Sequence, residues 1–363
     1  MGGSLSVGEV NTSEGLAALE GPWNDLVRRL DPVLLTTTFP FADVWWRHRS
    51  LGSKLFVLTV KDGGRLVGIA PFVVSVVDWR MVRARKVSFM FARYLESDFI
   101  AEAEHKEECI RATVQYAFKS TRCHYMELGG FTKASSSLPA LKKVAKELGV
   151  SFSQTYHSSG RYIPIAGTWE SFLKGRSTRF RKDLRYYERK LTNKGKLEIL
   201  RLGRGDSKEL LQKLRVVDQG SWKLGWFAEP ENIDWMNELI ADFSKRGWLD
   251  TFLLELNGTP IAYVVFVRTG GKAYAMFTSY DLKLAHESPG MVCFSKALNQ
   301  IFDEGEVSEV DFLSNYQYLR SWTDDVRSRY LVTLYPEGAS GRAVRVGRGI
   351  LHRARSIPNA TEG

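Results

Sequence analysis

Two stretches of this sequence repeat one pattern, in which two apolar runs flank a short turn. LFVLTVKDGGRLVGIAPF begins at Leu55, and TFLLELNGTPIAYVVF begins at Thr251. Their turns contain Asp62-Gly63-Gly64 and Asn257-Gly258, which are strong signals for antiparallel β-hairpins. A supersecondary unit that occurs twice in one chain indicates an internal duplication. The sequence therefore predicts two copies of one α/β unit.

The segments around the two hairpins also follow a similar order. After each hairpin, the periodicity predicts a strand or two, a helix and a further strand. In the first half we expect helices over 14–30, 39–49, 105–120 and 135–149, and a strand over 124–128. In the second half we expect strands over 161–165, 196–202, 272–280, 309–313 and 330–335, and helices over 206–220, 231–246 and 289–304.

These elements predict an α/β (α+β) protein made of tandem domains. Each domain is expected to have a central mixed, mostly antiparallel sheet flanked by helices. We place the first domain at residues 1–150 and the second, with the working site, at residues 151–336. Residues 337–363 are rich in Gly and Arg and are expected to form a basic, flexible tail.

The composition limits the class of protein. With 363 residues, of which 44% are apolar, the chain can fill two cores. The formal net charge of +10 favours anionic partners such as nucleic acid, acidic lipid or phosphate-bearing cofactors, without distinguishing among them. The three cysteines fit no disulfide framework and favour a reducing compartment. No apolar run reaches the ~20 residues of a membrane span and no secretory signal is visible, so we expect a cytoplasmic protein.

The most basic segment, KGRSTRFRKDLRYYERKL (174–191), also contains an apolar stripe with helical spacing. One face, which the helix should bury, contains Leu173, Phe180, Leu184, Tyr187 and Leu191. The other faces carry a dense group of cations that includes Arg179, Arg181 and Arg185. Because few acids lie in the segment to pair with them, an anionic partner is indicated, and a solvated charged surface is the alternative.

The helix expected from residue 289 is a second candidate binding feature. Ser288 is placed as its N-cap, Pro289 occupies the first helical position, and Gly290 allows close approach to the backbone. Free N–H groups at a helix start attract phosphate oxygens. We therefore expect Ser288, Gly290 and Met291 to bind a phosphorylated cofactor, and a simple helix cap is the alternative.

Other reaction classes find no support in the sequence motifs. The chain has no Walker motif, no glycine-rich nucleotide loop and no nucleophile elbow. The six histidines are scattered and none pairs with another at metal-ligand spacing, so we expect no metal site. An enzyme built from this chain would position a reactive partner and move a proton.

Several weak motifs occur in a characteristic order between about residues 20 and 335. They are FADVWWRH, LVGIAPF, the basic helix, GSWK at 220–223, SYD at 279–281, SPG at 288–290 and DFLSNYQYLRSW at 311–322. Taken together, the chain resembles the GNAT-like acyltransferases of the BioF2-like/CelD (Acetyltransf_6-type) group, which are related to the FemAB peptidyltransferases. In the family, Lys commonly follows the tyrosine of the last motif, whereas Leu319 follows Tyr318 here and Arg320 comes next.

This resemblance implies tandem GNAT-like domains and acyl transfer to an amine. A backbone N–H on a splayed strand would polarise the donor carbonyl, and the acceptor ammonium would lose a proton to a carboxylate or water. The candidate catalytic residues are Tyr280, Asp281, Asp311 and Tyr318, with Asp311 favoured as an acceptor-side base or amine-orienting anion. The candidate substrate-binding residues are Trp222, Lys223, Tyr316 and Trp322. The alternative for each of these residues is a structural role: packing in the core, capping a loop or forming an ordinary hydrogen bond.

The resemblance leaves the donor and the acceptor open. We expect acyl-CoA as the co-substrate, and an amine on an amino sugar, a polysaccharide precursor or a small metabolite as the acceptor. The alternative is an aminoacyl-tRNA-dependent, FemAB-like aminoacyl or peptidyl transferase. A third interpretation is a non-catalytic nucleic-acid-binding protein that uses the basic helix, with weak stacking by Tyr186 and Tyr187.

Overall fold

A computed structural model describes residues 5–79, 82–90, 95–203, 207–223, 229–338 and 341. The first half contains β1 (Leu5–Val10), α1 (Ser13–Ala18), α2 (Glu20–Val27), η1 (Leu35–Thr37), α3 (Phe39–Arg49), β2 (Lys54–Asp62), β3 (Arg65–Trp79), β4 (Val82–Phe89), β5 (Ile100–Ala101), η2 (Ala103–His105), α4 (Lys106–Thr121), β6 (Tyr125–Phe131) and α5 (Ser137–Glu147). Except for residues 337, 338 and 341, the predicted basic tail lies outside the described residues.

The second half begins with β7 (Ser151–Pro164), α6 (Trp169–Lys174), α7 (Thr178–Thr192) and β8 (Leu197–Leu202). It continues with α8 (Ser207–Gln219), α9 (Pro230–Lys245), β9 (Leu249–Leu256), β10 (Thr259–Thr269) and β11 (Lys272–Tyr280). It ends with η4 (Leu282–Glu287), α10 (Pro289–Glu304), β12 (Glu309–Asp311), η5 (Gln317–Ser321) and β13 (Val326–Tyr335).

The two halves repeat one topology, as the duplicated hairpins predict. In the first half, the hairpin β2–β3 is followed by β4, the crossover helix α4 and β6, which pairs with β4 in parallel. In the second half, β9–β10, β11, α10 and β12 follow the same order with the same pairing. The predicted fold class, α/β (α+β) with mixed, mostly antiparallel sheets flanked by helices, is confirmed.

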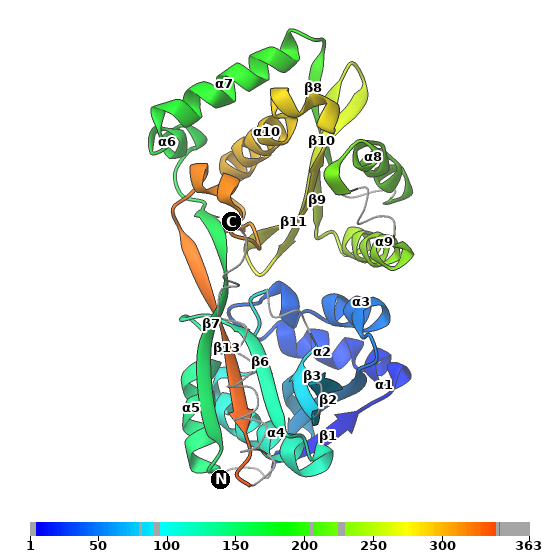
Figure 1. The fold of residues 1–363 in the computed structure, drawn as a ribbon, viewed down its shortest axis with the longest axis vertical. Coiled ribbons are helices and arrows are strands. Elements are labelled where there is room, and N and C mark those ends of the chain that lie inside the picture. The colour runs from blue at the N-terminus through cyan, green and yellow to red at the C-terminus, as the bar shows by residue number, and fades with distance from the viewer. Residues whose placement is uncertain are drawn as a thin grey trace, which may run out of the picture.

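Strands β7 and β13 join the two halves in the middle of one continuous sheet. β13 pairs with both β6 and β7, and the end of β7 pairs with β12. Figure 1 shows these two long strands running between an upper and a lower lobe. The domain boundary expected near residue 150 remains a prediction. A cut there would separate β6 from its partner β13.

One hydrophobic cluster also joins the halves. It combines Trp23 and Phe39 of the first half with Leu214, Met236 and Phe277 of the second. Helices α3 and α9 pack against each other at this junction (Figure 1). A second cluster lies under α7 and α10, on the opposite face of the second half's sheet. The sheet of the second half is therefore covered on both faces.

The basic segment forms two helices, α6 and α7, where one was expected. The break occurs because the Ser177 hydroxyl accepts a hydrogen bond of 3.2 Å from the Phe180 N–H and so caps a new helix. The predicted apolar stripe is confirmed, since Phe180, Leu184 and Leu191 are buried. Within the described residues, no helix is both long and apolar enough to cross a membrane.

Candidate active site

Strands β11 and β12 pair over a short stretch and then part. Lys272 to Tyr274 pair in parallel with Glu309 to Asp311. β11 then continues to Tyr280, bonded to β10 alone among the described strands. Residues 275–280 therefore present a free backbone edge, whose N–H groups could polarise a carbonyl oxygen. This edge leads through η4 directly into the start of α10.

The start of α10 offers little room for a phosphate. Ser288 is the N-cap residue, as expected, but it has a φ of 47° and its side chain makes no capping bond. The Met291 and Val292 N–H groups both donate to the Ser288 carbonyl, at 3.0 and 3.3 Å. A β-carbon at Gly290 would lie 3.2 Å from Cδ1 of Tyr280. The missing side chain at Gly290 therefore lets the Tyr280 ring lie close to the start of α10.

Of the residues predicted to bind the cofactor at α10, Gly290 alone has a first-turn N–H with no described partner. Pro289 has no N–H group, and the N–H of Met291 is engaged. The Met291 side chain packs against the second hydrophobic cluster. A phosphate bound here would need side-chain cations in addition to one backbone donor.

Two lysines from the end of the basic region reach the loop before α10. The Lys190 Nζ donates to the His286 carbonyl at 3.1 Å. Lys190 and Lys194 also lie 3.6 and 3.4 Å from the Glu287 carboxylate. These lysines, rather than the arginines expected from the sequence, are the cations that the described contacts place beside the start of α10.

The predicted arginines lie elsewhere on α7. The Arg179 side chain is 92% exposed and 3.8 Å from the Asp183 carboxylate. Arg181 donates to the Thr178 hydroxyl at 3.2 Å, and Arg185 is exposed. No contact in the described part of the chain joins these three arginines to Gly290. Arg179 and Arg185 are instead exposed on α7, a helix on the outer side of the second half (Figure 1).

Exposed tyrosines surround the free edge of β11. The rings of Tyr316 and Tyr318 stack with centroids 6.1 Å apart, and both are exposed. The Tyr318 hydroxyl lies beside Thr278 of β11 and near Tyr280. The structure thus brings Tyr280, Tyr316 and Tyr318 together. Asp281 caps the following loop, because its Oδ1 accepts from the Lys283 N–H at 2.9 Å.

Asp311 is embedded in a network of charges between the two halves. Its side chain is almost fully buried, with Oδ2 2.9 Å from the Arg327 guanidinium and Oδ1 3.9 Å from that of Arg329. The Leu313 N–H also donates to it, at 2.7 Å. Burial raises the pKa of Asp311, while Arg329 and Arg327 oppose this shift. This setting favours an orienting role for Asp311 over direct contact with a substrate.

Trp322 belongs to the core and does not line an open pocket. It is 3% exposed, and its ring packs edge-on against Phe180 with centroids 4.9 Å apart. Trp222, by contrast, is 59% exposed and lies next to Lys223. Of the predicted substrate-binding residues, Trp222 and Tyr316 therefore lie at the surface, whereas Trp322 and Lys223 are buried.

Lys223 lies in a buried polar cluster whose other members the sequence did not reveal. Its Nζ is 3.4 Å from the Tyr263 hydroxyl, which donates to both oxygens of Asp218 at 2.9 Å. Burial lowers the pKa of Lys223 to about 8, although Asp218 opposes the shift. Burial likewise raises the pKa of Asp218. The SYD motif was one available signal, because its Ser279 is buried beside Asp218.

The burial of Lys223 should make the stability of the protein depend on pH. The pKa of Lys223 falls from 10.5 to about 8 on folding, so the unfolded chain binds more protons between these pH values. Relative to Lys223→Met, the free energy of unfolding of the wild type should therefore rise by roughly 2 kcal/mol from pH 7 to pH 10. Urea unfolding of both proteins at several pH values measures this difference. A constant difference across the range would contradict the burial of a charged lysine.

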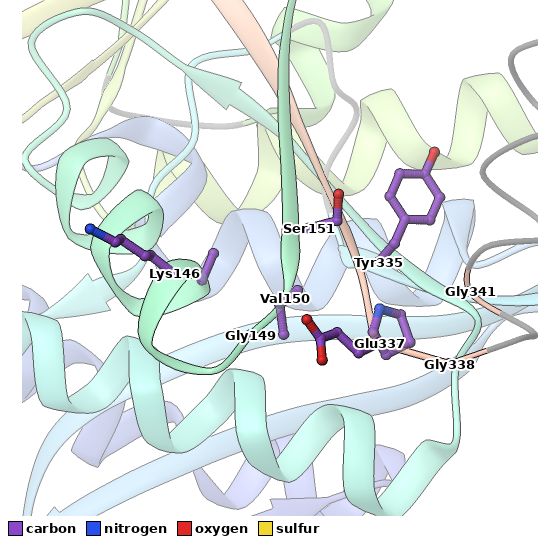
Figure 2. Close-up of a pocket in the computed structure, with 10 residues that line it drawn as sticks. Lys146, Gly149, Val150, Ser151, Tyr335, Glu337, Gly338 and Gly341 are labelled. Carbon is purple, nitrogen blue, oxygen red and sulfur yellow. The ribbon is translucent and has the colours of Figure 1, made fainter.

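The described cavities lie away from the free edge of β11. The larger, of about 720 Å³, lies where α5, β7 and β13 meet in the first lobe. Figure 2 shows Lys146, Ser151, Tyr335 and Glu337 around it. A smaller cavity, of about 200 Å³, is lined by Trp45, Lys86 and Glu127 at the point where β4 and β6 part. None of the predicted site residues lines either cavity.

The part of the chain that contains the free edge of β11 is similar to a known protein family. Residues 178–320 match the family model described as an acetyltransferase (GNAT) domain. The matched residues lie in the second half of the chain. This result confirms the resemblance to GNAT and FemAB-like acyltransferases on which the site residues were chosen. No curated protein matches the chain.

Solved structures share the fold of the whole chain. A crystal structure of FemX is 11% identical with a TM-score of 0.59, and the match covers 94% of this chain and 99% of FemX. The C-terminal domain of a putative lysylphosphatidylglycerol synthetase from Agrobacterium fabrum is 13% identical with a TM-score of 0.54, covering 93% and 96%. A tandem GNAT protein from the clavulanic acid biosynthesis pathway is 12% identical with a TM-score of 0.50, covering 93% and 100%. At these identities the similarity establishes the tandem GNAT-like fold alone.

Proposed function

We propose that this protein is an N-acyltransferase whose working site is the free edge of β11 in the second half. The parting of β11 and β12 after three paired residues is the observation that carries this proposal. A carbonyl oxygen placed against this edge would accept hydrogen bonds from backbone N–H groups, which stabilises the charge that develops during acyl transfer. Tyr280 and Tyr318 lie beside the edge and could protonate the leaving group.

Acyl-CoA is the donor that we propose first. The family match supports a GNAT-type donor, and Lys190 and Lys194 supply cations beside the start of α10. These lysines and the Gly290 N–H would together hold the phosphates of the donor. The acceptor would be an amine on an amino sugar, a polysaccharide precursor or a small metabolite. Exposed Trp222 and Tyr316 could stack on such an acceptor.

An aminoacyl-tRNA donor is the second candidate. The exposed cations of α7, a 15-residue helix, form an extended positive surface. Such a surface suits a nucleic-acid backbone and would make binding fall steeply with salt. The names of two structural relatives, FemX and lysylphosphatidylglycerol synthetase, fit aminoacyl transfer. A non-catalytic nucleic-acid-binding protein is the third interpretation, and a cytoplasmic location is part of the proposal for all three.

Product analysis tests this proposal. The protein is incubated with acetyl-CoA, longer acyl-CoA thioesters or charged tRNA, each with a panel of amines, and amide products are identified by mass spectrometry. An amide formed from a thioester supports the first donor, and salt-sensitive consumption of charged tRNA supports the second. Tight binding of nucleic acid with no amide from any donor would contradict acyl transfer.

Two double substitutions, each of which removes positive charge from the basic region, distinguish between the two proposed donors. Lys190→Ala/Lys194→Ala removes the cations beside α10, whereas Arg179→Ala/Arg185→Ala removes cations from the outer surface of α7. With an acyl-CoA donor, the first variant should raise the donor KM by about 10-fold or more and the second should leave it unchanged. With a tRNA donor, both variants should weaken binding and flatten its salt dependence. Equal KM values for both variants and the wild type, with every donor, would rule out a role for this charge.

A further inference from the structure

A buried lysine lies under an exposed ring on the α8 side of β11. Lys223 is 8% exposed, and its Nζ lies 5.7 Å from the centroid of the Trp222 ring. The rings of Tyr263 and Phe277 also approach this nitrogen, at 5.3 and 5.9 Å. Three aromatic rings therefore lie around the ammonium group, and the ring of Trp222 among them is exposed.

The polar contacts of Lys223 form a chain of hydrogen bonds that leads to Asp218. The Tyr263 hydroxyl donates its single proton to Asp218, so its oxygen can accept from the Lys223 Nζ. The backbone N–H of Lys223 donates to the Ser221 hydroxyl at 3.1 Å, and the Ser221 hydroxyl donates to the Asp218 carbonyl at 3.0 Å. Lys223 is therefore held from both its backbone and its side chain, which fixes the position of its nitrogen.

This chain is attached to the strand that presents the free edge. Phe277, which approaches the Lys223 nitrogen, belongs to the part of β11 beyond its pairing with β12. Ser279 of the same stretch is buried beside Asp218. If an acyl carbonyl binds at the free edge, the cluster of Lys223, Tyr263 and Asp218 lies on one face of the strand beside it, and α10 lies on the other face.

We propose that Lys223 is the proton acceptor for the incoming amine, with Tyr263 and Asp218 as positioning residues. This inference rests on the proposed acyl transfer. The acceptor ammonium gives one proton to neutral Lys223, and the free amine attacks the donor carbonyl. A C–N bond forms, and the C–S bond of a thioester or the C–O bond of an ester breaks. The leaving sulfur or oxygen takes a proton from Tyr280 or Tyr318, and the tyrosine regains one from the amine nitrogen. Lys223 then releases its proton to water.

The charges around Lys223 suit this role. Among the described residues, the charged group near the Lys223 Nζ is Asp218 of α8, and the other titratable group is Tyr263 of β10. Of the β11 residues, Phe277 lies near this nitrogen and Ser279 beside Asp218, and both are uncharged. Burial lowers the pKa of Lys223 to about 8, so a neutral amine is available near physiological pH.

The protonation of Lys223 can be measured without a substrate. The protein is labelled with ¹³C-lysine and titrated by NMR, with Lys223→Arg used to assign the signal. We expect one lysine to titrate near pH 8 and to shift to lower pH in Asp218→Asn, because the opposing carboxylate is gone. A Lys223 signal that titrates above pH 10 would overturn the inference whether or not the protein transfers acyl groups.

Kinetics then separate this inference from the proposed function. If the wild type forms an amide, kcat should rise with pH along the NMR titration of Lys223. Lys223→Arg should lose about 100-fold or more in kcat with little change in the donor KM. Tyr263→Phe should keep part of the rate and shift its pH profile. An unchanged kcat in Lys223→Arg would overturn the proton acceptor alone, whereas no amide from the wild type would overturn the proposed function and, with it, this inference.

Discussion

Asp311→Ala is expected to lower the free energy of unfolding by about 3–5 kcal/mol. The substitution removes the carboxylate that faces Arg327 and the fully buried Arg329, and so leaves positive charge in the interior. The cost is large because the two guanidinium groups lose this carboxylate in the interior, where water cannot replace it. Glu309 and Glu96 also approach Arg327 and would compensate in part.

Urea unfolding of Asp311→Ala and of Asp324→Ala measures this effect. Asp324 is a matched control, because its side chain is 94% exposed and lies 3.6 Å from Arg176. Its removal should change stability by less than about 0.5 kcal/mol. A stable Asp311→Ala protein that has lost only its activity would contradict the orienting role and restore Asp311 as the acceptor-side base.

Residues 1–150, produced alone, are expected to remain unfolded or to aggregate. Without β13, the edge of β6 loses its hydrogen-bonded partner, and without the second half the apolar surfaces of α2 and α3 lose theirs. An unpaired edge and an exposed apolar patch both promote association. We expect a large loss of native secondary structure and of amide protection in β6.

Circular dichroism and hydrogen exchange on this fragment test the expectation. Refolding an equimolar mixture of residues 1–150 and 151–363 is the matched control, because it supplies β13 from a separate chain. The mixture should recover protection in β6. A fragment that folds alone, with protected β6 amides, would show that the halves are independent domains.

The local elements could be predicted from the sequence, but the exchange of strands between the halves could not. The two hairpins carry clear turn signals, so β2–β3 and β9–β10 occur where expected. β7 and β13 were predicted as short strands near their ends, because the beginnings of both strands are polar and lack an alternating pattern. Their long-range pairing with each other stabilises these segments, and no local signal reports such a pairing.

The sequence motifs indicated which residues belong to the candidate site, but they indicated the role of each residue only in part. The alternation of β12 indicated that Asp311 faces away from its apolar neighbours, yet its partners Arg327 and Arg329 come from β13. The aromatic residues Trp222 and Trp322 look alike in sequence, but the first lies at the surface and the second fills the core. Lys223 was chosen from a motif, whereas Asp218 and Tyr263 became visible only when α8 and β10 were brought together.

Hydrogen exchange in the presence of a donor analogue tests the central claim most directly. A thioether analogue of acetyl-CoA, which cannot transfer its acyl group, is added at saturating concentration, and exchange is followed by mass spectrometry. We expect slower exchange in peptides that cover residues 275–292, which include the free edge of β11 and the start of α10. Protection confined to β4 and β6 of the first half, in a protein that forms an amide from acetyl-CoA, would contradict the site proposed for acyl transfer.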